Sequence, residues 1–261
     1  MENLLVIKIG GNIIDDAEKL ADFLQNFAAV KGHKILIHGG GKLATKMAEG
    51  LQIPQQMIDG RRITDAETLK IVTMVYAGSI NKNIVAQLQS FGCNAIGLSG
   101  ADGNLIEAHK RTHPTLDFGF VGDVDAINSS LINAFLHQGL TLVIAPITHN
   151  NKGQLLNTNA DTIAQEIAKA MASHMDTQLI YSFEKEGVLQ DVLNEQSVIP
   201  TLNPTTYAQL KKEKVIFEGM IPKLDNAFAA LQSGVKKVII GKAEKLEELI
   251  NGTAGTTLIH E

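Results

Sequence analysis

The sequence is poor in cysteine, since Cys93 is the only one among its 261 residues. A single thiol excludes an intrachain disulfide framework and any metal site made of cysteines alone. Long apolar runs are also missing, because no stretch approaches the roughly 20 consecutive residues that span a bilayer. The first residues lack the basic segment and the apolar run of a signal peptide. We therefore expect a cytoplasmic protein without a membrane partner.

Positive charge is scarce as well. The chain has 23 Lys and Arg residues against 28 Asp and Glu residues, which gives a formal net charge of −5. Surfaces that bind nucleic acids or anionic membranes need a basic patch, so we expect a small-molecule substrate and no nucleic-acid partner. The length fits one large domain or two of medium size.

Short runs of β-branched residues alternate with helical patterns along the chain. In the helical stretches, apolar residues recur at positions i, i+3, i+4 and i+7. Alternation of this kind favours βαβ units, so the predicted fold is α/β, with an open and mainly parallel β-sheet sandwiched between helices. The predicted strands are residues 5–9, 34–38, 95–98, 141–145, 177–181 and 237–240, and the clearest helices begin near Asp16 and cover 161–171 and 224–231.

Two further features shape the predicted organisation. Residues 53–64 contain Pro54 and Gly60 between short apolar pieces, which predicts a hairpin. A weak boundary divides the chain into two predicted lobes, 1–175 and 176–261. Ligands bind outside the carboxyl ends of the strands in an open α/β sheet. Residues at those ends are therefore the candidates for a functional site.

Two glycine turns follow predicted strands and precede predicted helices: Gly10-Gly11 and Gly39-Gly40-Gly41. Glycine lets the backbone approach a ligand closely, and a helix N-terminus offers free N–H groups to an anion such as phosphate. The alternative is that these glycines only make tight turns. Neither turn matches the Walker A or the dinucleotide-binding glycine pattern, which argues against a P-loop protein and a Rossmann dehydrogenase.

Two lysines occupy positions where a positive charge is costly. Lys8 interrupts an apolar strand, and Lys223 follows Pro222 in the first turn of a helix, the end that repels cations. A negative ligand such as a transferring phosphoryl group would offset both costs, although each lysine could instead reach solvent. Asp161 is either an ordinary first-turn carboxylate behind the N-cap Asn159 or an anchor that orients these lysines.

Further polar residues lie near the predicted strand ends. Arg62 could grip a carboxylate with two parallel hydrogen bonds or be an ordinary hairpin charge, and Asn157 could donate to a substrate. His38 precedes the second glycine turn and is expected to pack or to form hydrogen bonds there rather than to act as a base. His109 and His113 show no third ligand, so no protein-held metal is predicted.

These motifs resemble, in order and spacing, those of the acetylglutamate kinases, which are arginine-biosynthetic members of the amino acid kinase superfamily. The resemblance spans nearly the whole chain. The first two motifs are shared with carbamate kinases and aspartokinases, whereas the segments around Arg62 and Asn157 point to the N-acylglutamate branch. The motifs are Lys8-Ile9-Gly10-Gly11, His38-Gly39-Gly40-Gly41, Gly60-Arg61-Arg62-Ile63-Thr64, Asn157-Thr158-Asn159-Ala160-Asp161 and Gly219-Met220-Ile221-Pro222-Lys223.

The resemblance implies phosphoryl transfer from MgATP to the γ-carboxylate of an N-acyl-L-glutamate, with acetyl favoured and succinyl open. It implies that the 1–175 lobe binds the acylglutamate and forms a homodimer, and that the 176–261 lobe binds ATP, with Mg²⁺ held mainly by ATP and water. Lys8 and Lys223 would stabilise the transferring phosphoryl group, and Asp161 would hold both lysines in place. The other implied contacts are Gly10, Gly11 and Glu184 on the phosphoryl and ATP side, and Gly40, Gly41, Arg62 and Asn157 on the substrate side.

One segment departs from the family's pattern. After the strand at 177–181 the family has Ser/Thr-Asp-Val before a glycine, whereas this chain has Phe183 and Glu184 in the hydroxyl and aspartate positions. Glu184 would substitute for the aspartate with a longer reach. The departure also leaves open an acyl group other than acetyl.

Two alternative functions remain open, and one helix is expected to form a dimer contact. One rival is another amino acid kinase, such as a carbamate or glutamate kinase, but carbamate has no α-carboxylate for Arg62 to grip. The other is a non-catalytic nucleotide or amino-acid sensor on the same fold. In the helix after Thr64, Leu69, Val72 and Tyr76 share one side and are expected to form an isologous dimer contact.

Overall fold

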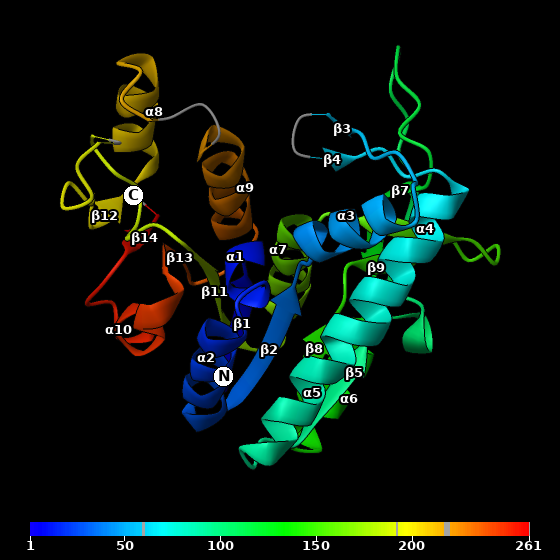
Figure 1. The fold of residues 1–261 in the computed structure, drawn as a ribbon. Helices are drawn as coiled ribbons and strands as arrows, with labels where there is room; N and C mark the ends of the chain where they lie inside the picture. The colour runs from blue at the N-terminus through cyan, green and yellow to red at the C-terminus, as the bar shows by residue number, and fades with distance from the viewer. Residues whose placement is uncertain (59–60, 192, 217–219, 261) are drawn as a thin grey trace.

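The protein is built around an open sheet of eight strands (Figure 1). The strand order is β12-β14-β13-β11-β1-β2-β8-β5, and every neighbouring pair is parallel except β13 and β14. This arrangement confirms the predicted α/β class. The computed structural model describes residues 1–58, 61–191, 193–216 and 220–260. Gly60 and Gly219 of the sequence motifs lie outside these ranges.

All six predicted strands are present in the main sheet, with ends that differ by at most a few residues. The sequence did not predict β12 and β14 at one edge, because two or three residues carry too little periodicity to stand out. The strands are β1 (Asn3–Ile9), β2 (His33–His38), β5 (Ala95–Leu98), β8 (Thr141–Ile144), β11 (Asp176–Phe183), β12 (Thr201–Leu202), β13 (Lys237–Lys242) and β14 (Thr256–Leu258).

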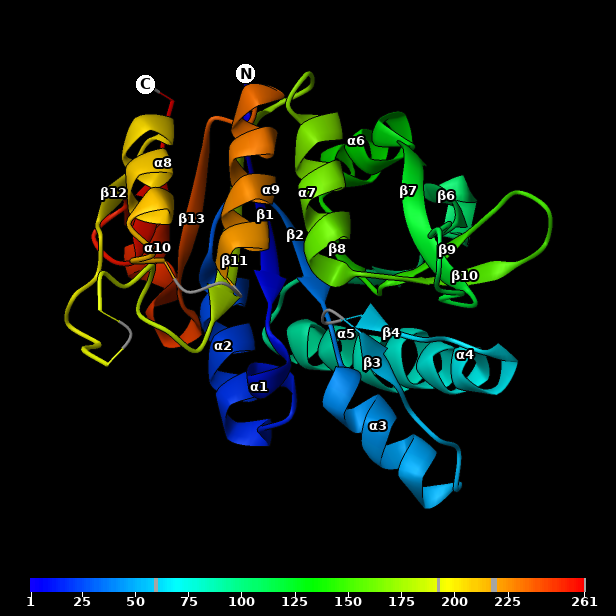
Figure 2. The same cartoon turned by 90° about the horizontal axis from the view of Figure 1, so that it is seen from above.

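Helices cover both faces of this sheet, as Figure 2 shows from above. The described helices include none that is long and apolar enough to cross a membrane. One hydrophobic core lies under α6 (Ser129–His137), α7 (Ala160–Met171), α8 (Pro204–Lys212) and α9 (Ile221–Gln232). The opposite core lies under α1 (Gly11–Ile14), α2 (Ala17–Ala29), α3 (Gly41–Gly50), α4 (Ala66–Val72), the π-helical segment η1 (Thr73–Ile80), α5 (Asn81–Ser90) and α10 (Leu246–Asn251).

The alternation of side chains along β1 decides which core each of its residues enters. Leu4 and Val6 belong to the core under α7 and α9, whereas Leu5 and Ile7 belong to the opposite core. Successive side chains of a strand point to opposite faces. Lys8 therefore points to the face covered by α7 and α9, near the carboxyl end of the strand.

A small closed barrel and a hairpin extend the molecule beyond the main sheet. The barrel consists of β6 (Ile106–Lys110), β7 (Val121–Ile127), β9 (Ile147–His149) and β10 (Leu155–Thr158). Strand β10 leads directly into α7 and so fixes the position of the helix start. The predicted hairpin is formed by β3 (Met57–Ile58) and β4 (Arg61–Arg62).

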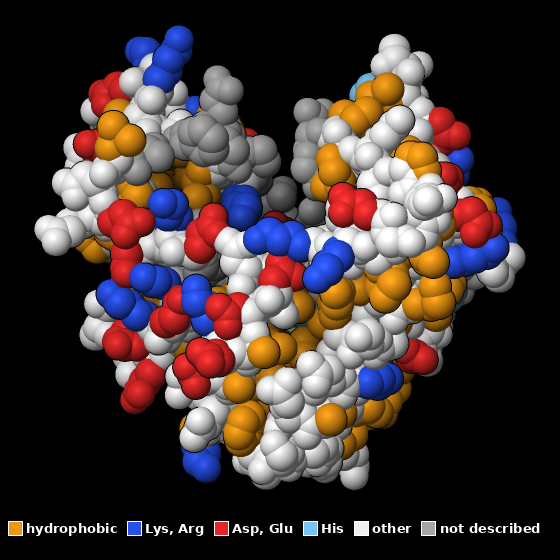
Figure 3. Space-filling model, in the orientation of Figure 1, with side chains coloured by type: hydrophobic (Ala, Val, Ile, Leu, Met, Phe, Trp, Pro, Cys, Tyr) orange, Lys and Arg blue, Asp and Glu red, His pale blue; other side chains and the backbone are white. Residues whose placement is uncertain are grey.

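A notch opens on the side of the molecule toward which β2 points. The space-filling view shows the surface hollowed between the projection that carries α8 and the projection that carries β3 and β4 (Figure 3). Ligands of open α/β sheets bind at such a carboxyl edge. The functional residues predicted from the sequence are found here.

The residues predicted from the sequence to form a dimer contact are not available for one. Leu69, Val72 and Tyr76 are all buried in the core of the single chain, where they pack under α4 and η1 against the sheet. Their shared side faces inward because an amphipathic helix turns its apolar stripe toward its own sheet. Met74 of the same segment is 60% exposed and points outward.

Candidate active site at the carboxyl edge of the sheet

The centre of the site is an ion pair between two neighbouring elements. Lys8 on β1 places its Nζ 2.8 Å from Oδ1 of Asp161, and the two side chains are only 13% and 21% exposed. Asp161 stands in the first turn of α7, and Asn159 caps that helix by accepting from the N–H groups of Asp161 and Thr162. The sequence predicted both the cap and the first-turn carboxylate. The two residues can pair because alternate side chains of β1 point to opposite faces of the sheet, and Lys8 is on the face that α7 covers.

Lys223 on α9 adds a second positive charge to this pair. Burial alone would raise the pKa of Asp161, but the charges of Lys8 and Lys223 outweigh burial and lower it. Burial lowers the pKa of Lys223, Asp161 opposes that shift, and Lys8 adds to it. The structure therefore brings all three predicted catalytic residues together, from β1, α7 and α9. The carboxylate of Asp161 therefore acts on two ammonium groups at once.

Tyr181 supports Asp161 from the neighbouring strand β11. Its hydroxyl donates to the main-chain oxygen of Asp161 at 3.2 Å. Burial, and then the charges of Asp161 and Glu166, raise the pKa of Tyr181 well above its ordinary value. The phenol therefore stays protonated and keeps its donor. The sequence did not single out this residue.

The second glycine turn is shaped by the helix beneath it. Gly40 has φ +145°, a value that L side chains rarely adopt, and a Cβ there would lie 2.2 Å from Cδ1 of Ile80. Only glycine fits this position. In the first turn, Gly11 faces the same pocket, whereas the N–H of Gly10 donates to the Ser182 oxygen at 3.1 Å and continues the pairing of β1 with β11.

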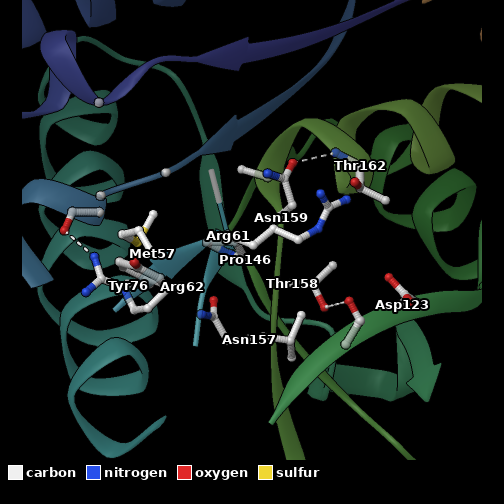
Figure 4. Close-up of a pocket in the computed structure, with 17 residues that line it drawn as sticks. Met57, Arg61, Arg62, Tyr76, Asp123, Pro146, Asn157, Thr158, Asn159 and Thr162 are labelled. Atoms are coloured by element: carbon white, nitrogen blue, oxygen red, sulfur yellow. Dashed lines mark hydrogen bonds between the residues drawn. The ribbon is translucent and has the colours of Figure 1, made fainter. Parts of the chain in front are cut away.

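A pocket of about 220 Å³ lies between the two turns, the hairpin and the start of α7 (Figure 4). Residues from several separate segments meet in it, as expected for a ligand site at a strand edge. Of the predicted substrate residues, Gly40, Gly41, Arg62 and Asn157 all line it. The described lining is Gly11, Gly39, Gly40, Gly41, Met57, Arg61, Arg62, Tyr76, Val121, Gly122, Asp123, Pro146, Asn157, Thr158, Asn159, Ala160 and Thr162.

Arg62 is held firmly at the wall of this pocket. It is 6% exposed, and its Nη2 donates at 2.8 Å to both the Gly41 oxygen and Oγ1 of Thr45. Its Nη1 donates to Oε1 of Gln55. These bonds tie the hairpin to the glycine turn and α3. Nδ2 of Asn157, which also lines the pocket, donates to Oγ1 of Thr64 at 3.0 Å.

Two charged residues of the pocket were not predicted from the sequence. Arg61 precedes Arg62 in the hairpin, and in Figure 4 its side chain extends toward the α7 side of the pocket. Asp123 comes from β7 and pairs with Arg111, whose Nη2 lies 2.5 Å from its carboxylate. No local sequence pattern marks Asp123, because the pairing of β7 with β6 brings it to the pocket.

Glu184 acts on Lys223 as well. Its charge acts to raise the pKa of Lys223, against the larger effect of burial. Glu184 also lines a second cavity of about 420 Å³, together with Asn12, Lys42 and Lys242. This cavity borders the first glycine turn, and the carboxylates of Asp15, Asp16 and Glu244 line it as well, so its lining carries no excess of positive charge.

Two carboxylates at the site are paired with cations. Asp161 is paired with Lys8, and Asp123 with Arg111. A group of potential metal ligands, formed by Glu2, His33 and His137, lies at the amino-terminal edge of the sheet, away from the pocket.

The fold and the site together define an α/β protein with a pocket at the carboxyl edge of its sheet. The sequence profile of the Amino acid kinase family matches residues 3–242, and the chain belongs to this family. An acetylglutamate kinase of Cytophaga hutchinsonii is 56% identical over 262 residues, which cover 99% of both chains. An acetylglutamate kinase of Parabacteroides distasonis is 51% identical over 248 residues, or 95% of this chain and 97% of that relative.

A solved structure shares the fold over the whole chain. N-acetylglutamate synthase from Neisseria gonorrhoeae, complexed with coenzyme A and N-acetyl-glutamate, superposes with a TM-score of 0.84 at 19% identity. The superposition covers 100% of this chain and 60% of the synthase. At this identity the likeness establishes the fold, and the family is established by the profile and the curated relatives.

Proposed function

We propose that this protein transfers the γ-phosphoryl group of ATP to the γ-carboxylate of N-acetyl-L-glutamate, giving an acyl phosphate in arginine biosynthesis. The observation that carries the proposal is the Lys8–Asp161–Lys223 cluster at the pocket that Arg62 and Asn157 line. The names of the relatives support the same activity and favour neither rival. Carbamate, in contrast, has no α-carboxylate for Arg62 to grip.

The chemistry needs alignment and charge neutralisation more than proton transfer. The attacking carboxylate is already ionised at neutral pH, so no general base is required. Lys8 and Lys223 meet the negative charge on the transferring phosphoryl group, and Asp161 holds the two ammonium groups near each other. The N–H groups of Gly11 and Gly40 approach the same group from the two turns, and Gly10 anchors its turn to β11.

Arg62, Gly41 and Asn157 are proposed to hold the acceptor. The guanidinium of Arg62 would pair with the α-carboxylate, while its bonds to Gly41 and Thr45 fix its position. Asn157 would hydrogen-bond the polar groups of the acylamino acid. Holding the acceptor at both ends places its γ-carboxylate in line with the phosphoryl group.

The nucleotide is proposed to lie on the C-terminal side, between Lys223 and Glu184 in the 176–261 lobe. Glu184 would organise Lys223 in place of the family's aspartate, in keeping with its effect on the pKa of Lys223. Mg²⁺, bound by ATP oxygens and water, would supply further charge neutralisation on the phosphates. Since the reaction uses ATP, we propose a cytoplasmic location.

Trapping of the acyl phosphate with hydroxylamine tests the activity. The assay compares N-acetylglutamate, N-succinylglutamate and free glutamate, each with MgATP. We expect hydroxamate from N-acetylglutamate. Hydroxamate from free glutamate alone would make the protein a glutamate kinase, and no signal from either acylated substrate would reject the proposal.

Two variants test the roles of the residues. Lys8→Ala should lower kcat roughly 100- to 1000-fold with little change in the KM for the acylglutamate, because the lysine acts on the phosphoryl group. Arg62→Lys should mainly raise the KM for the acylglutamate, since an ammonium cannot keep the forked geometry. Lys236→Ala, at a surface pair with Asp176, is the matched control. An unchanged kcat in the Lys8 variant would remove this residue from the chemistry.

We further propose that two copies associate as a homodimer through the outer side of α4 and η1. Met74 is 60% exposed there, although its neighbours Leu69 and Val72 face the core. Light scattering on the purified protein gives the mass directly. A Met74→Glu variant should weaken the dimer, and a monomeric wild type would overturn this proposal.

A further inference from the structure

His38 lies fully buried directly beneath the second glycine turn. It is the last residue of β2, and its ring makes a hydrogen bond at each nitrogen. Nδ1 lies 2.8 Å from the main-chain oxygen of Gly39, and Nε2 lies 3.2 Å from Nδ2 of Asn81. Asn81 is the first residue of α5 and is itself 1% exposed.

The surroundings of Asn81 fix the direction of both bonds. Its Nδ2 also lies 3.0 Å from the Val143 oxygen, and its Oδ1 lies 3.1 Å from Nζ of Lys82. A reversed amide would set oxygen against oxygen and nitrogen against an ammonium, so the amide nitrogen must face His38. Asn81 therefore donates to Nε2, and the ring hydrogen of the neutral imidazole lies on Nδ1.

The ring is neutral at physiological pH. Burial lowers the pKa of His38 to about 4, the bond to Gly39 opposes this shift, and the charge of Lys82 adds to it. A neutral ring with its hydrogen on Nδ1 donates to the Gly39 oxygen in a single fixed direction.

The Gly39 oxygen belongs to the peptide that joins Gly39 to Gly40. That peptide is trans, so its N–H points opposite to its C=O. His38 draws the C=O toward the buried ring, and Gly39 and Gly40 line the pocket on the other side. We propose that His38 is a positioning residue that turns the Gly40 N–H toward the transferring phosphoryl group, with Asn81 selecting the tautomer that makes this possible. The inference rests on the proposed phosphoryl transfer.

Two substitutions separate positioning from simple structural support. The amide of an asparagine at position 38 lies near the place of Nδ1 and keeps a donor for Gly39, whereas the amide of a glutamine lies near the place of Nε2. Each variant loses one buried hydrogen bond, so both should unfold more easily by similar amounts. We expect His38→Asn to retain about tenfold more kcat than His38→Gln, with KM values within about threefold of wild type.

Equal kcat values in the two variants would overturn the proposal. So would kcat losses that are proportional to the loss of unfolding stability in each variant. His109→Asn, at an exposed pair with Asp125, is the control and should keep full activity. If the acceptor proves to be a different acid, the same comparison applies to the kcat with that acid. Failure of the proposed function is therefore distinguishable from failure of this inference.

A second measurement does not depend on activity. Nitrogen-15 NMR of histidine-labelled wild-type protein distinguishes the two neutral tautomers by their ring nitrogen shifts. The signal of His38 is identified by its loss in the His38→Asn variant. We expect the hydrogen on Nδ1 at neutral pH, and a hydrogen on Nε2, or a charged ring, would overturn the proposal.

Discussion

Lys8 and Asp161 meet at 2.8 Å although 153 positions separate them in the chain, since 161 − 8 = 153. The strand β1 and the helix α7 that carry them are in direct contact along one face of the sheet. The pair is therefore a property of the tertiary fold, and it connects the stability of the protein to the charge state of its active site.

Asp161→Asn should make stability less dependent on pH in acid. The pKa of Asp161 is lowered from 3.8 in the folded protein, so its charge stabilises the fold above that value. This contribution disappears as the pH falls through the lowered pKa. Denaturant titrations from about pH 3 to about pH 7 should show the wild type more stable than the variant at neutral pH, with the gap closing in acid. A gap that widens toward low pH would contradict the assignment, and Asp125→Asn serves as an exposed control.

Glu184→Gln should move the alkaline limb of the activity profile to lower pH. Burial already lowers the pKa of Lys223, and among the opposing effects is the charge of Glu184. Without that charge the pKa falls further, so Lys223 loses its proton, and the enzyme its activity, at a lower pH. Profiles of kcat between about pH 6 and about pH 10 measure the limb. Glu186→Gln, whose carboxylate pairs with Lys245, should leave the limb in place.

Gly40→Ala should cost both stability and activity. The added methyl group would lie 2.2 Å from Ile80 in a backbone conformation that alanine avoids, so we expect about 1–3 kcal/mol of destabilisation and a large loss of kcat. Gly50 ends the same helix α3 with open space around it and an ordinary φ, so Gly50→Ala is the matched control. Thermal unfolding should rank Gly50→Ala at or above the wild type, because alanine favours helix. Equal melting temperatures for the two variants would refute the steric account.

Lys34→Met should destabilise the protein without altering catalysis. The buried ammonium of Lys34 donates to three carbonyl oxygens at the end of α2, those of Phe27, Ala28 and Val30 at 2.8, 2.9 and 2.6 Å. Methionine fills the space but leaves those acceptors unpaired, at a cost of about 3 kcal/mol. Urea unfolding measures the loss, and Lys31→Met is the exposed control. Because Lys34 lies near the start of β2, far along the strand from the glycine turn, kcat should stay the same.

The sequence predicted the main strands and the glycine turns well, because each rests on local features. The run Leu5–Ile9 and the run 34–38 are apolar, end in glycine and precede helical patterns, and each of these signals is contained in a few residues. The cost of a charge inside β1 likewise pointed to Lys8 before its partner was visible. Family resemblance then supplied the acceptor residues around Arg62 and Asn157.

The site residues and contacts that could not be predicted from the sequence depend on strand register and on burial. Asp123 reaches the pocket through the pairing of β6 with β7, and Tyr181 meets Asp161 through the pairing of β1 with β11. The dimer prediction failed at Leu69 and Val72 for a related reason, because an apolar stripe does not reveal whether it covers the chain's own sheet or a partner. The role of His38 also required the distant Asn81.

The place of β1 in the sheet has a consequence for how the chain comes to fold. β1 lies between β2 and β11, and its partner residues on one side are Asp176 to Ser182. During synthesis, that flank of an apolar strand stays without its neighbour until roughly two thirds of the polypeptide has left the ribosome. Such open strand flanks invite association with other nascent chains. A shortened form ending near residue 175 would keep this flank bare permanently, so we expect it to accumulate as aggregate and not as a working half.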